Sequence, residues 1–284
     1  MATAAPAHAF SRFSAAPLTP GIGAEIDGVD LSCDLPDETI ADIRRALLTY
    51  KVIFFRDQNI TQEQHIAFAR RFGDLEIHPI TPKDQPNPEI FHLTARPGTS
   101  RGANVWHSDV TWRETPSLGS VLRARIMPEV GGDTLFADMV AAYEGLSPSM
   151  KAWLCTLTAV HDGGIFAALQ GKPESSFHEL YPPQEHPVVR THPETGEQAL
   201  YVNSAFTTHI KGLSREESDW LLKRLYAQAS FPEYQCRFRW KVNSIAFWDN
   251  RVCQHYAVAD YFPAPRAMER VTVVGDRPYF DPGG

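Results

Sequence analysis

The chain lacks three features that would narrow its class at once: paired cysteines, dense basic runs and long apolar stretches. None of its four cysteines forms a CxxC pair, which argues against a dithiol redox motif and a Cys-rich zinc site. No Lys/Arg cluster offsets the net charge of −7, so nucleic acid is not an expected partner. No apolar run approaches the roughly 20 residues that a membrane helix needs. We therefore expect a cytoplasmic protein without a membrane partner.

The composition is that of an ordinary globular protein, with 43% hydrophobic and 21% charged residues among 284. We expect a single domain over residues 17–284. Residues 1–16 lack the continuous apolar segment of a signal peptide, and we expect them to form a flexible tail. Residues 163–185 are rich in Gly, Pro and Ser without clear periodicity, which indicates a lid.

A few helical patterns interrupt many short β-rich runs. The expected helices cover residues 36–50, 61–73, about 139–157 and 214–229. Three of them have a capping residue at or near the start, namely Thr61, Ser147 and Ser214. After Val105 most of the chain consists of short β-rich runs separated by Gly, Pro and Asn. We predict a mainly β fold with helical inserts (α+β), built on a double-stranded β-helix, or jelly-roll, core flanked by helices.

The stretch VWHSDVTW places His107 and Asp109 one residue apart in what looks like a buried strand. Side chains two residues apart on a strand share one face, so these two can aim at one point. A metal needs a third ligand, and His255, in the late β-rich segment FWDNRVCQHYAVADY, is the best candidate. Two His and one carboxylate leave positions open, as non-haem Fe(II) chemistry requires. A buried His–Asp hydrogen bond is the default alternative, and a zinc hydrolase site is a further one.

Two arginines follow His255 in PRAMERVTVVGD, at Arg266 and Arg270. An Arg in a mostly apolar strand needs an anionic partner, because a buried unpaired guanidinium is costly. Its planar fork matches a carboxylate at two points. Taken alone, each Arg could be a structural salt-bridge residue. Beside two His and one carboxylate, they indicate a diacid cosubstrate and an anionic substrate.

From about Gly21 to Tyr279 the chain resembles the family of taurine dioxygenase and 2,4-dichlorophenoxyacetate dioxygenase. The motifs that carry the resemblance are WHSDVTW, ETP, GGDTLF, AAYEGLS, HPVVRTHPETG, VNSAFTT, WDNRVCQHYAVADY and RAMERVTVVGD. The resemblance implies an Fe(II)- and 2-oxoglutarate-dependent dioxygenase that consumes O₂. It also implies a homo-oligomer, either a dimer or a tetramer.

The resemblance also implies roles for individual residues. Fe(II) would be held by His107, Asp109 and His255, which would form the catalytic centre. The C5 carboxylate of 2-oxoglutarate would be bound by Thr134 and Arg266. A small anionic substrate would contact His78, Phe206, Arg270 and the backbone N–H of Val110.

The positions expected around the substrate depart from the family pattern in part. Thr81 stands where taurine-specific members have a Tyr, and Ala103 stands where they have an Asn. We first expect hydroxylation of taurine or a related sulfonate, coupled to decarboxylation of 2-oxoglutarate to succinate. The alternative is the same chemistry on an alkyl sulfate, an aryloxyalkanoate or another carboxylate. A more distant alternative is a non-catalytic jelly-roll protein that binds a metal or ligand.

Overall fold

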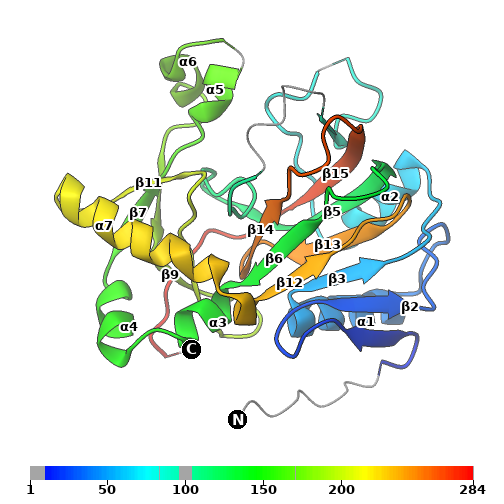
Figure 1. The fold of residues 1–284 in the computed structure, drawn as a ribbon, viewed down its shortest axis with the longest axis horizontal. Coiled ribbons are helices and arrows are strands. Elements are labelled where there is room, and N and C mark those ends of the chain that lie inside the picture. Colours follow the sequence, from blue (N-terminus) through cyan, green and yellow to red (C-terminus); the bar gives the residue numbers. More distant parts are fainter. Residues whose placement is uncertain (1–9, 83, 96–103, 170, 284) are drawn as a thin grey trace.

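The computed structural model describes residues 10–82, 84–95, 104–169 and 171–283, and its fold is mixed, rich in β-sheet and flanked by helices (Figure 1). The largest sheet has seven strands in the order β1-β2-β3-β13-β5-β15-β4. Their bounds are β1 Ser14–Pro17, β2 Ala24–Asp27, β3 Val52–Phe55, β13 Ile245–Asp249, β5 Ser117–Ile126, β15 Arg266–Val274 and β4 Phe91–Ala95.

Three smaller sheets complete the described β-structure. The first has the order β12-β6-β14, with β12 Gln235–Phe238, β6 Thr134–Asp138 and β14 Cys253–Ala257. The second has the order β11-β7-β8, with β11 Thr207–Ile210, β7 Thr158–His161 and β8 Gln184–Pro187. The third pairs β9 Val189–Thr191 with β10 Gln198–Leu200.

The seven-stranded sheet and the β12-β6-β14 sheet share an apolar core. The Phe54 ring on β3 stacks on Phe238 of β12, with ring centroids 3.9 Å apart. It also meets Phe136 of β6 edge-on at 5.5 Å. Leu122 of β5 and Met268 of β15 belong to the same cluster. The residues that alternate with these on the large sheet pack into a second cluster, so the central strands β3, β5 and β13 bury both of their faces.

Helices cover the remaining apolar faces. The outer face of the large sheet packs against α1 (Asp37–Tyr50) and α2 (Gln62–Arg70). A second cluster gathers around α3 (Met139–Glu144), α4 (Pro148–Leu154) and α7 (Arg215–Tyr226). The short helices α5 (Ile165–Leu169) and α6 (Glu174–His178) lie together at one end of the molecule (Figure 1). Two 3₁₀ turns, Ala227–Ser230 and Pro232–Tyr234, follow α7.

The predicted capping residues are confirmed. The Thr61 and Ser214 side chains each accept a backbone N–H three residues on, and Gln64 and Glu217 reciprocate, so both capping boxes are complete. Ser147 caps α4 with Pro148 at its first turn. The single helix expected over 139–157 is instead two helices, because the chain turns at Gly145 and starts again at Ser147.

Two predictions need correction, and a third segment has more structure than its sequence indicates. The segment VWHSDVTW is not a strand: only His107 makes an isolated bridge, and turns follow it. Residues 14–16 do not form a flexible tail, because β1 pairs with β2 and Phe13 is buried in the core; residues 1–9 lie outside the described part. Residues 163–185 contain α5 and α6, whose shortness hides the helical period in the sequence.

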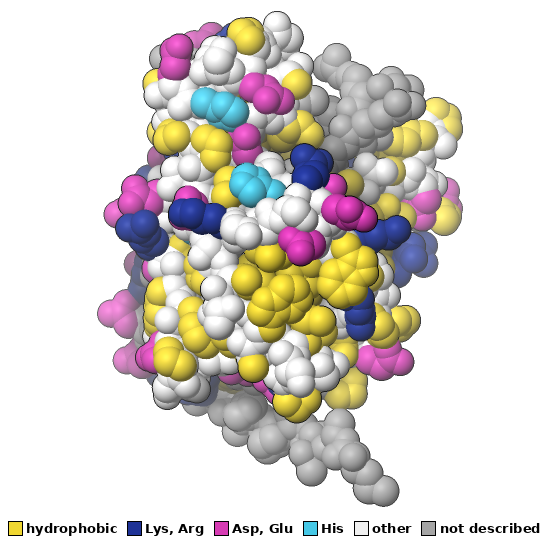
Figure 2. All heavy atoms as spheres, turned by 90° about the vertical axis from the view of Figure 1, so that its left-hand side faces the viewer, with side chains coloured by type: hydrophobic (Ala, Val, Ile, Leu, Met, Phe, Trp, Pro, Cys, Tyr) yellow, Lys and Arg dark blue, Asp and Glu magenta, His cyan; other side chains and the backbone are white. Residues whose placement is uncertain are grey.

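One face of the molecule carries α4 and α7, and Figure 2 shows hydrophobic side chains gathered on it. Trp153 on α4 and Trp220 on α7 are both exposed. Exposed apolar patches of this kind are typical of contact surfaces. None of the helices in the described ranges is long and apolar enough to cross a bilayer.

The fully buried imidazole of His65 on α2 makes folding sensitive to acid. Its Nε2 lies 3.0 Å from the Val121 carbonyl oxygen, and burial lowers its pKa from 6.5 to about 4. The unfolded chain therefore binds a proton near pH 6.5 that the folded chain takes up only near pH 4, so stability is lost as the pH falls through this window. We expect His65 to account for about 2 kcal/mol of lost unfolding free energy between pH 7.5 and 5. Urea unfolding of His65→Gln at both pH values should show a correspondingly smaller loss, and an unchanged loss contradicts the assignment.

Candidate active site

The structure brings His107, Asp109 and His255 together. One ligand atom from each residue lies within 4.8 Å of the others, and all three residues are buried. The Nε2 atom of His107 is 4.0 Å from Oδ1 of Asp109. This predicted constellation therefore exists in space, although it does not arise from strand alternation.

Backbone pairing between His107 and His255 brings the two imidazoles side by side. The backbone N–H of each residue donates to the backbone carbonyl of the other, at 3.1 Å from His107 and 2.8 Å from His255. The centroids of the two imidazole rings are 4.1 Å apart. His107 Nδ1 lies 2.8 Å from the Val105 carbonyl, so it carries the proton and leaves Nε2 as a lone pair. Burial lowers the pKa of both histidines, so both are neutral. Neutral imidazole is the form that binds a metal.

Asp109 is held as an anion by its surroundings. Burial opposes the charge, but the Arg270 guanidinium outweighs it and, with the hydrogen bond from Ser120, holds the pKa of the carboxyl well below its usual range. Arg270 donates directly to Asp109 Oδ1, and Ser120 Oγ donates to Oδ2 at 2.7 Å. The carboxylate is therefore ionised and oriented before any metal binds.

A second predicted pair, Thr134 and Arg266, meets near Gly132. Arg266 Nε donates to the Gly132 carbonyl at 3.1 Å, and Thr134 follows two residues later on β6. Trp240 Nε1 donates to Thr134 Oγ1 at 2.9 Å, which leaves the hydroxyl hydrogen of Thr134 free to donate elsewhere. We find no carboxylate paired with the buried Arg266 in the described part of the chain. These two side chains together suit an anion.

The β-sheet register relates this anion site to the metal cluster. On the β6–β14 ladder His255 pairs with Phe136, and Thr134 pairs with Ala257. His255 and Thr134 therefore share a face and are separated along the strands by two residues, or about 7 Å. A short dicarboxylate is long enough to reach from the metal cluster to Thr134 and Arg266.

Arg270 lies on the same face of β15 as Arg266, four residues further along the strand. Its Nη1 contacts Asp109, but its buried Nε has no partner among the described residues. The guanidinium also stacks over the Phe91 ring, with Cζ 5.2 Å from the centroid. Arg270 thus contacts a metal ligand and still has donors for a second anion, a double task that the sequence does not indicate.

His78 lies near Arg270, packed between aromatic rings. Its ring stacks on Phe91 at 4.5 Å and meets Phe166 edge-on at 5.0 Å. Burial, with Arg270 nearby, lowers the pKa of His78 to about 3, so the ring is neutral. The Ile80 amide donates to Nδ1 at 3.4 Å, which leaves Nε2–H as a directed donor. Thr81, in the same turn, has a buried hydroxyl without a partner among the described residues.

Val110 adopts a left-handed conformation with φ +49°, which is strained for a β-branched residue. We find no acceptor for its N–H within the described ranges. Val110 and Phe206 belong to a cluster of mostly aromatic residues beside the metal site, with Trp112, Ala167 and Phe177 and the half-buried Phe166, Tyr181 and Ala205. Phe206 meets the His107 ring at 6.2 Å. This cluster forms an apolar wall on the side of the predicted substrate contacts. Ala103, the other expected substrate position, lies outside the described residues.

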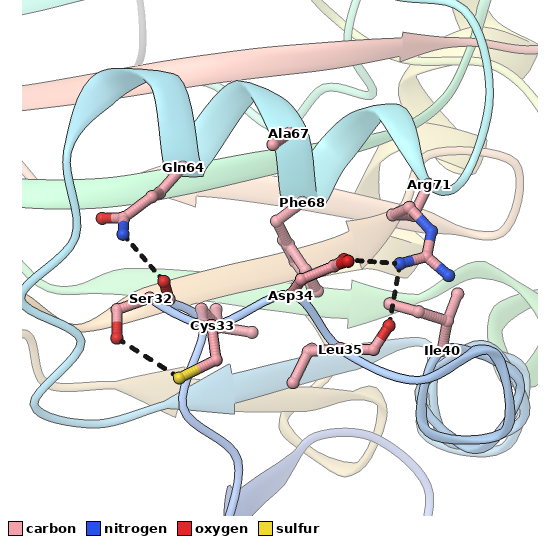
Figure 3. A pocket seen from close by; sticks show the side chains of 10 residues that line it. Ser32, Cys33, Asp34, Leu35, Ile40, Gln64, Ala67, Phe68 and Arg71 are labelled. Carbon is pink, nitrogen blue, oxygen red and sulfur yellow. Dashed lines mark hydrogen bonds and ion pairs between the residues drawn. The ribbon is translucent and has the colours of Figure 1, made fainter.

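Figure 3 shows a surface pocket of ≈ 310 Å³ between α2 and residues 31–35. Arg71 pairs there with Asp34 and donates to the Leu35 carbonyl, and Gln64 donates to the Ser32 carbonyl. Its polar groups already have protein partners, and it contains none of the metal cluster. It is therefore separate from the candidate active site.

Comparison with known proteins identifies the family. Residues 14–272 match the model of the "Taurine catabolism dioxygenase TauD, TfdA family". The chain belongs to this family. An alpha-ketoglutarate-dependent sulfate ester dioxygenase of Pseudomonas putida is 38% identical, over 92% of this chain and 89% of that protein. An alkylsulfatase of Acinetobacter baylyi is 36% identical, over 91% of this chain and 84% of that protein.

Solved structures agree with this assignment. A taurine dioxygenase from Burkholderia xenovorans has a TM-score of 0.83 and 38% identity, covering 96% of this chain and 94% of that chain. A structure of AAD-2 in complex with Mn(II) and N-oxalylglycine has a TM-score of 0.80 and 30% identity. It covers 95% of this chain and 100% of that chain. This chain is therefore a dioxygenase dependent on Fe(II), 2-oxoglutarate and O₂. Its neutral histidines, ionised Asp109 and unpaired Arg266 fit those groups.

The sequence did not indicate how this dioxygenase supports Asp109. The Asn250 Oδ1 atom accepts the Asp109 backbone N–H at 3.0 Å and Trp248 Nε1 at 2.8 Å. Its Nδ2 donates at 3.1 Å to Ser120 Oγ, which in turn contacts Asp109. The only sequence signal is a polar residue directly after the buried strand β13, within WDN.

Removing Asn250 should weaken metal binding. Asn250→Ala deletes the acceptor for the Asp109 amide and frees Ser120, so the carboxylate loses its orientation. We expect the dissociation constant for Fe(II) to rise about tenfold or more, measured anaerobically by calorimetry. Ser120→Ala, which removes one bond to Asp109, should have a smaller effect. Equal Fe(II) affinity in Asn250→Ala and wild type contradicts this role.

Proposed function

We propose that this dioxygenase oxidises a small organosulfur anion, a sulfonate or a sulfate ester, at the centre formed by His107, Asp109 and His255. The observation that carries the proposal is the presence of two buried arginines on one face of β15, of which Arg270 also contacts the metal ligand Asp109. Arg266 with Thr134 suits 2-oxoglutarate. Arg270 with His78 suits the substrate anion. The sulfate ester and sulfonate activities named for relatives support this choice of anion.

The protein residues have separate tasks in this proposal. Fe(II) with 2-oxoglutarate and O₂ would supply the oxidising power when bound, with loss of CO₂ and formation of succinate. His107 and His255 would donate lone pairs, and Asp109 would supply the negative ligand. Thr134 and Arg266 would fix the far carboxylate of the cosubstrate.

On the substrate side, His78 Nε2–H, Arg270 and the Val110 amide would bind the anion, and Phe206 would exclude water. Hydroxylation of the carbon bearing the sulfur group gives an unstable product that collapses to an aldehyde and a free sulfite or sulfate.

The apolar wall favours an apolar substrate tail. The cluster beside His78 consists of aromatic and small apolar residues. The acidic groups near it already have partners, since Glu76 pairs with Arg113 and Asp162 pairs with His178. Taurine has an ammonium group that needs a carboxylate or other hydrogen-bond acceptors when it leaves water, and such a wall supplies few of them. We therefore favour alkyl sulfates and apolar sulfonates, with taurine as the first comparison.

We also propose a fold type, a domain range and a lid for this chain. The two sheets that share the central core would form a double-stranded β-helix, or jelly roll, in a single domain that includes residues 14–16 of β1 in addition to the expected 17–284. Residues 163–185, with α5 and α6, would act as the lid that completes the aromatic wall. The homo-oligomer stays a prediction, to be tested by light scattering.

The direct test is a substrate screen. Purified protein with Fe(II) and 2-oxoglutarate is given taurine, hexanesulfonate, octyl sulfate and an aryloxyacetate, and O₂ uptake and succinate are measured. We expect octyl sulfate or hexanesulfonate to give the highest kcat/KM, with aldehyde and sulfate or sulfite formed in equal amounts with succinate. Turnover of the aryloxyacetate alone contradicts the organosulfur assignment.

His78→Phe tests the substrate anion site with little change in packing. The phenyl ring can keep the stack on Phe91 but cannot donate a hydrogen bond. We expect the KM for the organosulfur substrate to rise about tenfold, because a hydrogen bond to a charged group is lost. The KM for 2-oxoglutarate should not change, since Arg266 and Thr134 are intact. A rise in both constants shows a general disturbance of the site instead.

A further inference from the structure

The residue next to the aromatic wall, Arg113, connects three segments around the proposed substrate site. Its Nη2 and Nε lie 2.8 and 3.2 Å from Glu76 Oε1, in the segment that leads to His78. Its own backbone N–H donates to the Val110 carbonyl at 3.0 Å, which closes the turn after Asp109. Its guanidinium also reaches Tyr181, which follows α6.

The Arg113 guanidinium makes cation–π contacts with two rings, those of Tyr181 and Trp112. The Arg113 Cζ atom lies 4.5 Å from the Tyr181 ring centroid and 4.8 Å from that of Trp112. The two rings also meet each other edge-on at 5.3 Å. A planar guanidinium can contact both rings and still pair with a carboxylate, which an ammonium cannot do as well.

The two rings belong to the wall that would face the substrate tail. Trp112 meets His78 edge-on at 6.3 Å and Phe166 of α5 at 5.7 Å. Tyr181 packs on Phe177 of α6 at 5.0 Å. Arg113 thus lies where the two short helices, the anion-binding segment and the metal-ligand turn meet.

Glu76 fixes the other end of Arg113. Its backbone N–H donates to the Thr272 carbonyl on β15 at 2.9 Å, and its side chain is largely buried. Burial raises the pKa of Glu76 even though Arg113 opposes this. Removing Arg113 alone would therefore leave a poorly solvated carboxylate, and a test must remove both charges.

We propose that Arg113 is a positioning residue that connects Glu76 to Tyr181 and holds α6 and the aromatic wall closed over the substrate tail. It does not contact the reacting atoms. It sets the preference for apolar tails by keeping Trp112 and Tyr181 in place. This inference rests on the proposed organosulfur substrate, but the closed position of α6 does not.

The test compares Glu76→Gln/Arg113→Met, Tyr181→Leu and the triple variant with wild type. The substrates are butyl, hexyl and octyl sulfate. We expect the double variant and Tyr181→Leu each to raise the KM for octyl sulfate about tenfold, with much less change for butyl sulfate. The KM for 2-oxoglutarate should stay the same. Because both changes break one connection, their effects should not add in the triple variant.

The single variant Arg113→Met is measured beside the double variant. The proposal is overturned if Arg113→Met raises the KM for octyl sulfate while Glu76→Gln/Arg113→Met has the wild-type KM, because Arg113 would then only neutralise Glu76. Arg113→Lys keeps the charge but not the planar face, so its KM for octyl sulfate should lie between those of the wild type and the double variant. Additive effects in the triple variant also overturn it.

A measurement without substrate separates this inference from the proposed function. Hydrogen exchange of peptides covering residues 174–181 should be faster in Glu76→Gln/Arg113→Met than in wild type, while α7 peptides exchange equally. Equal exchange in residues 174–181 contradicts the positioning role even if no alkyl sulfate is turned over. Faster exchange with an inactive wild type on every organosulfur compound overturns only the proposed substrate.

Discussion

Replacing His255 with alanine is expected to abolish succinate formation that depends on the prime substrate. The imidazole is one of three groups whose ligand atoms lie within 4.8 Å of one another, and it is buried. Two remaining ligands bind a divalent ion weakly, so the metal would be lost or mispositioned at micromolar concentration. Activity should be measured as succinate formed at saturating 2-oxoglutarate with added Fe(II).

The matched control is His209→Ala, which removes an exposed histidine on β11. It should retain wild-type activity and Fe(II) affinity. The loss in His255→Ala should persist at high Fe(II), because no nearby side chain in the described ranges can replace the ligand. Substantial activity in His255→Ala rules out the proposed ligand set.

The second large effect is expected from Arg266→Ala. Arg266 is buried, its Nε donates to the Gly132 carbonyl, and no carboxylate in the described part of the chain forms an ion pair with it. Losing a charge-assisted contact to the far carboxylate of 2-oxoglutarate should raise its KM about 10- to 100-fold. The KM for the organosulfur substrate should change little, because Arg270 and His78 are intact.

Arg266→Lys should recover part of the affinity, since an ammonium keeps the charge but not the fork. Arg215→Ala, at an exposed position on α7, is the control for loss of an arginine elsewhere. The measurement is initial rate against 2-oxoglutarate concentration at fixed substrate. An unchanged KM for 2-oxoglutarate shows that the cosubstrate carboxylate binds elsewhere.

Local signals in the sequence were sufficient where the structure depends on neighbouring residues. Thr61 with Gln64 and Ser214 with Glu217 predicted two helix starts, because a capping box involves only four consecutive residues. The grouping of His107, Asp109 and His255 was proposed from the residue pattern with a buried hydrogen bond as the alternative, and the family resemblance then assigned it to Fe(II). The pairing of β6 with β14, which places Thr134 relative to His255, depends on residues more than a hundred positions apart.

Other features could not be predicted because they arise only from the folded arrangement. Asn250 contacts the Asp109 amide across 141 residues, and nothing beside it in the sequence specifies that contact. The apparent strand VWHSDVTW is a bridge followed by turns, since Val110 takes a left-handed conformation that a β-branched residue normally avoids. Nothing near Arg113 in the sequence indicates its contacts, because Glu76 and Tyr181 come from distant segments.

The most direct test of the central claim is an anaerobic titration of the Fe(II)-loaded protein with 2-oxoglutarate, followed by visible absorption. A 2-oxo acid chelated to Fe(II) gives a charge-transfer band that neither component has alone. The wild type should develop this band to saturation at one equivalent per chain. Arg266→Ala should require more 2-oxoglutarate, and His255→Ala should give no band. A full band in His255→Ala would show that the metal and cosubstrate bind at a site other than the one formed by His107, Asp109 and His255.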